Sequence, residues 1–335
     1  MRSFAVWYEG KEHNKRIKAD FHVNYWSKLP YKKNGKIFFF DFGIKVEGIS
    51  AVKNINIYCP FNLELDDIKD LGGKISNEIL VNAVFNKNYK VENGVPKHCV
   101  VKDTDGTSFI IYALNETDDI NLCKYKRNKY LVDNPEANQK SPGTLIIIKT
   151  SNILLGTDEK TKNIDNYYFR FRIIVNENNL KNITEEVESI NIFKDAIEAM
   201  ELLDFRVNDI RSCCEDVKAR FNSGDKFFLK SIHFLVMRDV NDLVMVDGCR
   251  YSCRLLEQDI WKQYIDNLEP NVVAYHFKKK SDSDISVDEI SLLIKFRFRK
   301  YKIKQILIYL AITWCMGLFI NWSFNRLCMF FGGGE

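Results

Sequence analysis

The chain has 335 residues, of which 46% are apolar, and its 49 Lys and Arg residues against 45 Asp and Glu residues give a formal net charge of +4. Six of these cations lie in residues 295–304, which contain no carboxylate, so residues 1–294 are close to neutral. This distribution excludes the broad positive surface of a protein that binds duplex DNA nonspecifically. The length and apolar content suffice for one large domain or two smaller ones.

The start of the chain, "MRSFAVWYEGKEHNKR", lacks the apolar core of a secretory signal, so we expect the polar part of the chain to stay in the cytoplasm. Nine cysteines, two of them adjacent, suit reduced thiols better than a disulfide framework. A zinc site would have to be drawn from Cys213, Cys214, Cys249, Cys253 and His233, which include no C-x-x-C pair. We therefore expect no metal and no cofactor.

Eight segments rich in aromatic and β-branched residues are predicted strands. They are Lys36–Val46, Asn54–Cys59, Thr107–Leu114, Gly143–Thr150, Asn166–Val175, Phe227–Asp239, Asp242–Asp247 and Asn271–Lys279. Helical spacing predicts fewer helices: one after a Ser76 cap, one over residues 183–200 capped by Thr184, and two in "DIRSCCEDVKARF" and "LLEQDIWKQYI". The predicted fold class is α+β, with a β-rich cytosolic domain followed by one C-terminal transmembrane helix.

The polar stretch "LVDNPEANQKSPG" is the best candidate for a boundary within the cytosolic part, because it combines two prolines with Asn and Ser. It predicts a β-rich front lobe at residues 1–132, a loop or boundary at 133–143, and an α+β back lobe at 144–294. Whether the two lobes are separate domains stays open at this point.

Catalytic motifs are incomplete throughout the chain. "DFG" at Asp41–Gly43 has no H-R-D loop to accompany it, and "DLGGKIS" has Ile68 and Ile75 where a phosphate-binding loop needs Gly and Ser or Thr. "DTDGTS" begins like a calcium loop but has Leu114 at the position of the bidentate Glu. We therefore expect no enzyme, and no catalytic residue is predicted.

Two clusters are candidate ligand-binding residues. In "CKYKRNKY", the cations Lys124, Lys126, Arg127 and Lys129 are interleaved with tyrosines, a combination that binds phosphates and stacks on bases, although an edge strand protected by lysines has the same pattern. In "YYFRFRI", period-2 alternation sends Tyr168, Arg170 and Arg172 to one face, where two arginines can hold a phosphate or carboxylate. A structural salt bridge with acidic neighbours is the alternative for this second pair.

The end of the chain predicts a membrane span. Residues 305–325 form an almost uninterrupted apolar run of the length that crosses a hydrocarbon core, with Trp322 suited to the far interface and a short extracytoplasmic tail at 326–335. The segment before it, 295–304, is a basic juxtamembrane segment that marks the cytoplasmic end and suits anionic lipid headgroups. Its cations are Lys295, Arg297, Arg299, Lys300, Lys302 and Lys304, and Phe296, Phe298 and Tyr301 are placed to enter the headgroup layer. A helix buried in a soluble core is the alternative.

The predicted membrane helix is asymmetric. Thr313, Gly317, Asn321 and Asn325 follow one another at i+4 steps and form a slanted polar stripe, and small or polar residues on one face promote helix association in lipid. Trp314 lies in the same sector and argues against a simple open channel. The stripe predicts a homo-oligomer, through helix association or by lining a pore.

This layout, a soluble domain followed by "QILIYLAITWCMGLFINW", resembles the single-pass transmembrane effectors of bacterial anti-phage defence systems, in particular those of the Hailong type. The resemblance covers the layout alone. It implies a cytosolic domain that senses a nucleotide or a short single-stranded nucleic acid, and helices in the inner membrane whose oligomerisation or channel opening that ligand controls. A tail-anchored scaffold that recruits partner proteins and a membrane-tethered enzyme are the alternatives, and the polar stripe favours the effector over the scaffold.

Overall fold

The computed structural model describes residues 2–11, 16–27, 37–93, 97–125, 143–154, 161–187, 198–266, 268–282, 284–299 and 303–331. Two compact units divide the chain. The larger comprises Met1–Glu185, Leu203–Val240 and Val246–Ile294, and the smaller comprises Glu186–Leu202, Asn241–Met245 and Lys295–Glu335. Each unit is therefore assembled from segments that are far apart in sequence.

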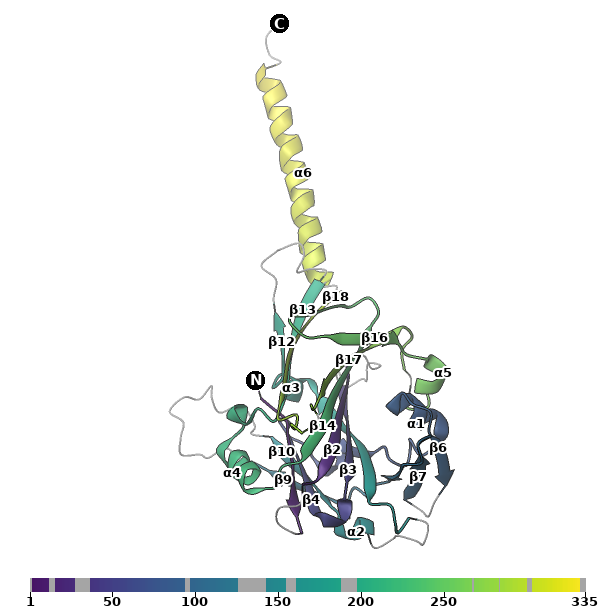
Figure 1. Cartoon of the computed structure of the whole chain (residues 1–335). Coiled ribbons are helices and arrows are strands. Elements are labelled where there is room, and N and C mark those ends of the chain that lie inside the picture. Colours follow the sequence, from purple (N-terminus) through teal and green to yellow (C-terminus); the bar gives the residue numbers. More distant parts are fainter. Residues whose placement is uncertain are drawn as a thin grey trace. The chain divides into compact units, whose positions relative to one another are not determined.

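A large sheet dominates the described part of the chain. Its strand order is β16 (Tyr251–Leu255), β17 (Val272–Lys280), β14 (Phe228–Asp239), β2 (Lys18–Trp26), β3 (Ile37–Glu47), β11 (Asn166–Asn176), β8 (Ser108–Tyr112), β7 (His98–Lys102) and β6 (Lys90–Asn93), with β5 (Ile68–Asp70) pairing β11. Neighbouring strands are antiparallel except for the β14–β2 and β11–β8 pairs, which are parallel. Figure 1 shows β14, β2 and β3 side by side at the centre of this sheet.

Two smaller sheets contain the remaining described strands. The first has the order β1 (Ala5–Gly10), β4 (Val52–Cys59), β10 (Thr144–Lys149) and β9 (Ile120–Lys124), and all of its pairs are antiparallel. The second has the order β12 (Thr184–Val187), β13 (Glu198–Val207), β18 (Ile290–Arg299) and β15 (Leu243–Val246). Strands from both predicted lobes pair within the same sheets, since β10 joins β4 and β11 joins β3.

Six α-helices are described beside these strands. They are α1 (Glu78–Phe85), α2 (Ser151–Leu154), α3 (Glu177–Leu180), α4 (Glu215–Ser223), α5 (Gln258–Trp261) and α6 (Ile303–Phe331), with short 3₁₀ turns at Ile49–Ala51, Leu65–Asp67 and Ile210–Ser212. Figure 1 draws α6 as one uninterrupted helix. Its segment Ile306–Met329 is long and apolar enough to cross a membrane, and none of it is buried.

The two faces of the large sheet bury different side chains. On β3, Phe40 and Phe42 point to one face, where their rings contact Phe4, while Asp41, Gly43 and Lys45 alternate to the other face. That second face packs against a cluster that includes residues of α1 and α5: Trp26, Leu80, Val81, Tyr168, Trp261, Tyr264 and Ile265 are all buried in it. The alternation of β3 thus places its charged residues Asp41 and Lys45 in a partly apolar environment.

The predicted β-rich fold with a C-terminal apolar helix is confirmed: the described residues are rich in strands, and one helix among them is long and apolar enough to span a membrane. All eight predicted strands are present, with ends within two residues of their predicted positions. The predicted helix over residues 183–200 is wrong, since Thr184–Val187 and Glu198–Val207 are strands. Helix α1 begins one residue later than predicted, because the Asn77 side chain, and not Ser76, accepts the N–H of Leu80 at 2.9 Å.

Candidate functional site

Strand register brings histidines and cations together on the second face of the large sheet. His22 on β2 lies opposite Gly43 on β3 and opposite His233 on β14. His233 in turn lies opposite Lys278 on β17, and Gly43 opposite Arg170 on β11. Side chains on the same face of adjacent strands lie about 5 Å apart. We call the residues His22, Lys45, His233, His276 and Lys278 the histidine–lysine face.

Beside this face, a fully buried carboxylate is held by four hydrogen bonds. Asp41 Oδ1 accepts from Arg172 Nε at 2.6 Å, and Asp41 Oδ2 accepts from Arg172 Nη2 at 2.9 Å, Trp26 Nε1 at 2.7 Å and the Tyr264 hydroxyl at 2.8 Å. Burial alone would raise the pKa of the Asp41 carboxyl, but the charge and hydrogen bonds of Arg172, with help from Arg170, hold it below its ordinary value. Asp41 and Arg172 therefore form a buried ion pair.

Arg170 lies between this ion pair and the histidine–lysine face. Its Nε donates to the Tyr264 hydroxyl at 2.6 Å and its Nη1 donates to the Tyr168 hydroxyl at 2.8 Å. Burial opposes its charge, but Tyr168, Tyr264 and Asp41 raise the pKa of the guanidinium. Its Nη2 is buried and has no hydrogen-bond acceptor among the described residues. Arg170 therefore keeps its positive charge, and its Nη2 group has no acceptor among the described residues.

Gly43 makes room for the tyrosine that Arg170 holds. A Cβ atom added at Gly43 would lie 2.2 Å from the Tyr168 hydroxyl and 2.9 Å from its Cζ. The Tyr168 ring therefore crosses β3 where that strand has no side chain. The triplet Asp41–Gly43 has a structural explanation here: its Asp binds an arginine, and its Gly admits a ring.

Two hydrogen-bond chains fix the protons of the histidines. The Tyr168 hydroxyl accepts from Arg170 and lies 3.5 Å from His22 Nδ1, so it donates to that nitrogen and leaves the proton of His22 on Nε2. The Ser231 hydroxyl donates to Asp20 at 2.5 Å and accepts from His233 Nε2 at 3.0 Å. His233 Nδ1 then accepts from His276 Nε2 at 3.0 Å.

The three histidines are neutral near pH 7. Burial, together with the charges of Arg170 and Lys278, lowers the pKa of His22 to about 3. Burial likewise lowers the pKa of His233 to about 2 and lowers that of His276. The rings of His22 and His233 are 4.7 Å apart, so protonating one opposes protonating the other. The face thus carries its positive charge on lysines and arginines alone.

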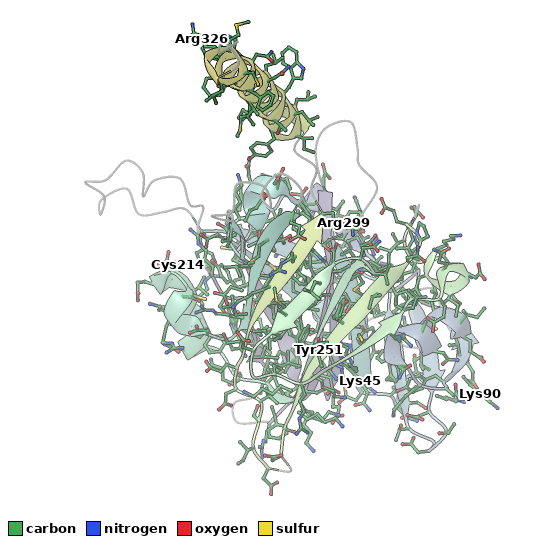
Figure 2. The ribbon with its side chains drawn as sticks, turned by 90° about the horizontal axis from the view of Figure 1, so that it is seen from above. Lys45, Lys90, Cys214, Tyr251, Arg299 and Arg326 are labelled. Atoms are coloured by element: carbon green, nitrogen blue, oxygen red, sulfur yellow. The ribbon has the colours of Figure 1, made fainter. Side chains whose placement is uncertain are left out.

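Several cations of this face have no carboxylate partner. Lys230 pairs with Glu47 and with Asp20, and Lys87 pairs with Asp103 at 3.3 Å. In the part of the chain that the structure describes, no carboxylate lies within ion-pair distance of the remaining lysines Lys45, Lys278 and Lys280. Lys45 Nζ instead lies over the Phe109 ring at 4.1 Å, and burial lowers its pKa. Figure 2 labels Lys45 on the sheet.

Of the six residues predicted to bind a ligand, three lie outside the described residues and two others form ion pairs. Lys124 ends β9 and pairs with Glu64, while Lys126, Arg127 and Lys129 lie outside the described residues. Arg170 and Arg172 do share one face of β11, as their alternation predicts. For Arg172 the structure shows the structural salt bridge, whereas Arg170 borders the histidine–lysine face.

The juxtamembrane residues belong partly to a strand. Lys295, Arg297 and Arg299 lie on β18, where Arg297 Nε is 3.9 Å from Glu198 Oε2. Phe296 is completely buried, so its predicted insertion into lipid headgroups is wrong. Lys300 and Lys302, with Tyr301, lie outside the described residues, and so does the side chain of Lys304.

The polar stripe of α6 is exposed along its whole length. Thr313, Gly317, Asn321 and Asn325 are all exposed, and the Thr313 hydroxyl donates to the carbonyl of Tyr309 at 2.8 Å. The amides of Asn321 and Asn325 have no hydrogen-bond partner among the described residues. The helix extends past residue 325 to Phe331, and the Arg326 guanidinium lies 4.7 Å over the Trp322 ring.

The cysteines and the metal-binding residue types form no site within the described ranges. All nine cysteines are free. Among the residues the structure describes, no three His, Cys, Asp or Glu side chains come together in a group that could hold a metal ion. The three histidines of the histidine–lysine face make the hydrogen bonds given above.

Sequence reasoning missed the histidine cluster. Each of its members occupies a polar position between two apolar residues, in "FHV", "IHF" and "YHF", so each was available as an inward-facing residue of an alternating strand. Their meeting depends on β2, β14 and β17 being neighbours in the sheet. Local patterning predicts such strands but not their order.

Neither a comparison with protein-family models nor one with curated protein sequences finds a match to this chain. What the site can do follows from its own residues. It is a half-buried surface rich in hydrogen-bond donors and cations.

Proposed function

We propose that this chain is a single-pass membrane effector, in which α6 spans the inner membrane and the β-rich domain lies in the cytoplasm. The domain senses a nucleotide or oligonucleotide-like ligand and controls self-association of the helices, which permeabilises the membrane. Anti-phage defence is the setting that fits such an effector, by the resemblance of its layout.

The observation that carries the proposal is the pair of amides on α6. Asn321 and Asn325 lie within the segment Ile306–Met329, none of which is buried and which is otherwise almost entirely apolar. A side-chain amide without a partner is costly in hydrocarbon, because lipid offers it no hydrogen bond. A second α6 helix supplies that partner, and Gly317 one turn away lets two backbones approach closely. An inert anchor would have no use for this stripe.

The basic residues that precede α6 support the proposed orientation of the helix in the membrane. Lys295, Arg297 and Arg299 directly precede α6, and positive charges flanking a span favour the cytoplasmic side. Anionic lipid on that side attracts each such cation by about 1 kcal/mol. The domain that these residues connect to the helix would then remain inside the cell.

The proposal is tested with the full chain in liposomes that contain a self-quenched dye, both without a ligand and with ATP or tri-adenylate added, because the ligand is proposed to control association. Asn321→Leu removes an amide at nearly constant volume, and Ile312→Leu on the opposite side of α6 is the matched control. We expect chemical cross-linking to trap oligomers of the unaltered chain and of Ile312→Leu, with dye release, and Asn321→Leu to lose both. A chain that stays monomeric in lipid, or an Asn321→Leu variant that behaves like the control, overturns the proposal. Oligomers that form without any dye release would instead identify a tail-anchored scaffold.

A further inference from the structure

We propose that the histidine–lysine face is the ligand site of this chain and that it binds a phosphate-bearing ligand of the nucleotide class. The inference deepens the proposed function, because it names the surface at which the domain would receive its signal. Lys45 and Lys278 contact phosphate oxygens on either side of the His22–His233 pair, and Arg170 acts from behind as a fixed charge.

The first support is a surplus of donors without acceptors. Lys45 and Lys278 have no ion-pair partner among the described residues. His22 carries its proton on Nε2, because its Nδ1 accepts from Tyr168, and that N–H has no acceptor in the part of the chain described. Arg170 Nη2 is a further donor without an acceptor among the described residues, but it is fully buried, so Arg170 acts on a ligand through its charge. Phosphate oxygens, which only accept, complement a surface of this kind.

The second support is the balance of charge around the histidines. The carboxylates that face them are already engaged: Asp41 by Arg172, Asp20 and Glu47 by Lys230, and Asp103 by Lys87. Burial lowers the pKa of Lys45 and of Lys278, and the attraction of Asp20, joined at Lys45 by that of Glu47, offsets this effect only in part. A bound anion would compensate the charges of both lysines.

The dimensions of the face leave room for more than one phosphate. Lys45 is on β3 and Lys278 on β17, with β2 and β14 between them. Neighbouring strands are about 4.8 Å apart, so the two lysine backbones are separated by roughly 14 Å. A nucleoside triphosphate or a short oligonucleotide lying across β2 and β14 spans such a distance.

Aromatic rings at the edge of the face suit a base. Phe85, at the end of α1, is half-buried and its ring centroid lies 6.0 Å from that of His22 and 4.8 Å from that of Tyr168. Rings of this kind stack on bases of any sequence, with about 1–3 kcal/mol per base. The combination of stacking rings with unpaired cations favours a nucleotide over an acidic protein segment.

The experiment measures binding to the full chain in detergent micelles by titration calorimetry. The probes are ATP, tri-adenylate, tripolyphosphate and, as the uncharged comparison, adenosine. Lys45→Met keeps the side-chain stem over Phe109 and removes the charge. Lys90→Met is the matched control, because Lys90 is an exposed lysine on the edge strand β6 and is labelled apart from Lys45 in Figure 2.

We expect at least one polyanion to bind, adenosine to bind much more weakly, and Lys45→Met to weaken binding by about tenfold or more, the usual effect of losing a charged hydrogen bond. Lys90→Met should leave the affinity unchanged. Should Lys45→Met unfold, Lys278→Met at an exposed position serves the same purpose. The proposal is overturned if no polyanion binds, or if the Lys45 and Lys90 variants bind equally. Since binding in micelles does not require helix association, this result and the Asn321→Leu result can fail separately.

Discussion

Replacing Asp41 by Asn should destabilise the larger unit severely although it changes only one atom. The carboxylate accepts four hydrogen bonds and donates none. An amide nitrogen at the Oδ2 position would face three donors, from Trp26, Arg172 and Tyr264, and at the Oδ1 position it would face Arg172 Nε. In either orientation a donor meets a donor, and the buried Arg172 charge loses its counter-ion.

The expected loss is about 3–5 kcal/mol of unfolding free energy, the usual result of removing one partner of a buried ion pair. Thermal and guanidinium unfolding of the full chain in detergent, followed by tryptophan fluorescence, measure it, since Trp26 itself binds Asp41. Asp66→Asn, at an exposed carboxylate, is the control and should change stability by less than about 0.5 kcal/mol.

A second substitution distinguishes the loss of the ion pair from a general loss of stability. Asp41→Asn leaves the buried Arg172 charge without a counter-ion. Arg172→Met removes that charge, so the double variant should be more stable than Asp41→Asn alone. The reasoning would be refuted by an Asp41→Asn variant that loses less than about 1 kcal/mol, or by a double variant that is less stable than that single one.

Two further substitutions test the neighbouring geometry. Gly43→Ala should cost about 1–3 kcal/mol, because the new Cβ would overlap the Tyr168 hydroxyl, whereas Gly73→Ala meets only ordinary contacts and should be far milder; equal unfolding temperatures of the two variants would contradict this. The pKa of His22 is about 3 in the folded chain against an ordinary value of 6.5, so the unfolded chain binds the proton first and stability falls as pH drops below about 6.5. His22→Asn should therefore show a smaller fall in melting temperature between pH 7.5 and pH 5 than the unaltered chain, and an identical fall would show that His22 does not titrate in this window.

The strands of the large sheet were predictable from sequence where their alternation is strong. In "YYFRFRIIV" the period of two correctly places Arg170 and Arg172 on one face. The partner of Arg172 was not predictable, because Asp41 is 131 residues away and is brought opposite by the β3–β11 pairing. Period and propensity are local properties, whereas strand order is not.

The wrong prediction of a helix over residues 183–200 shows that local helix propensity can also mislead. "EAMELLDFRV" is rich in Glu, Ala, Met and Leu, which favour helices, yet it forms β13 with Leu203 and Phe205 completely buried. The Phe205 ring stacks on Phe234 of β14 with centroids 3.6 Å apart. Tertiary burial of these side chains outweighs a preference of a few tenths of a kcal/mol per residue.

Two arginines on one face of β11 differ in whether their charge is neutralised within the fold. On β11, Arg172 is neutralised by Asp41, so its charge stabilises the fold and is not offered to a ligand. Arg170, two residues earlier, binds only the tyrosine hydroxyls Tyr168 and Tyr264 and keeps its charge. Because Tyr264 also donates to Asp41, moving the Asp41 ion pair would move Arg170 and, through Tyr168, His22. In the proposed sensor, a ligand that draws on the charge of Arg170 would thereby be coupled to the buried Asp41 carboxylate and its four hydrogen bonds, a rigid connection that could convert binding into a change elsewhere in the chain.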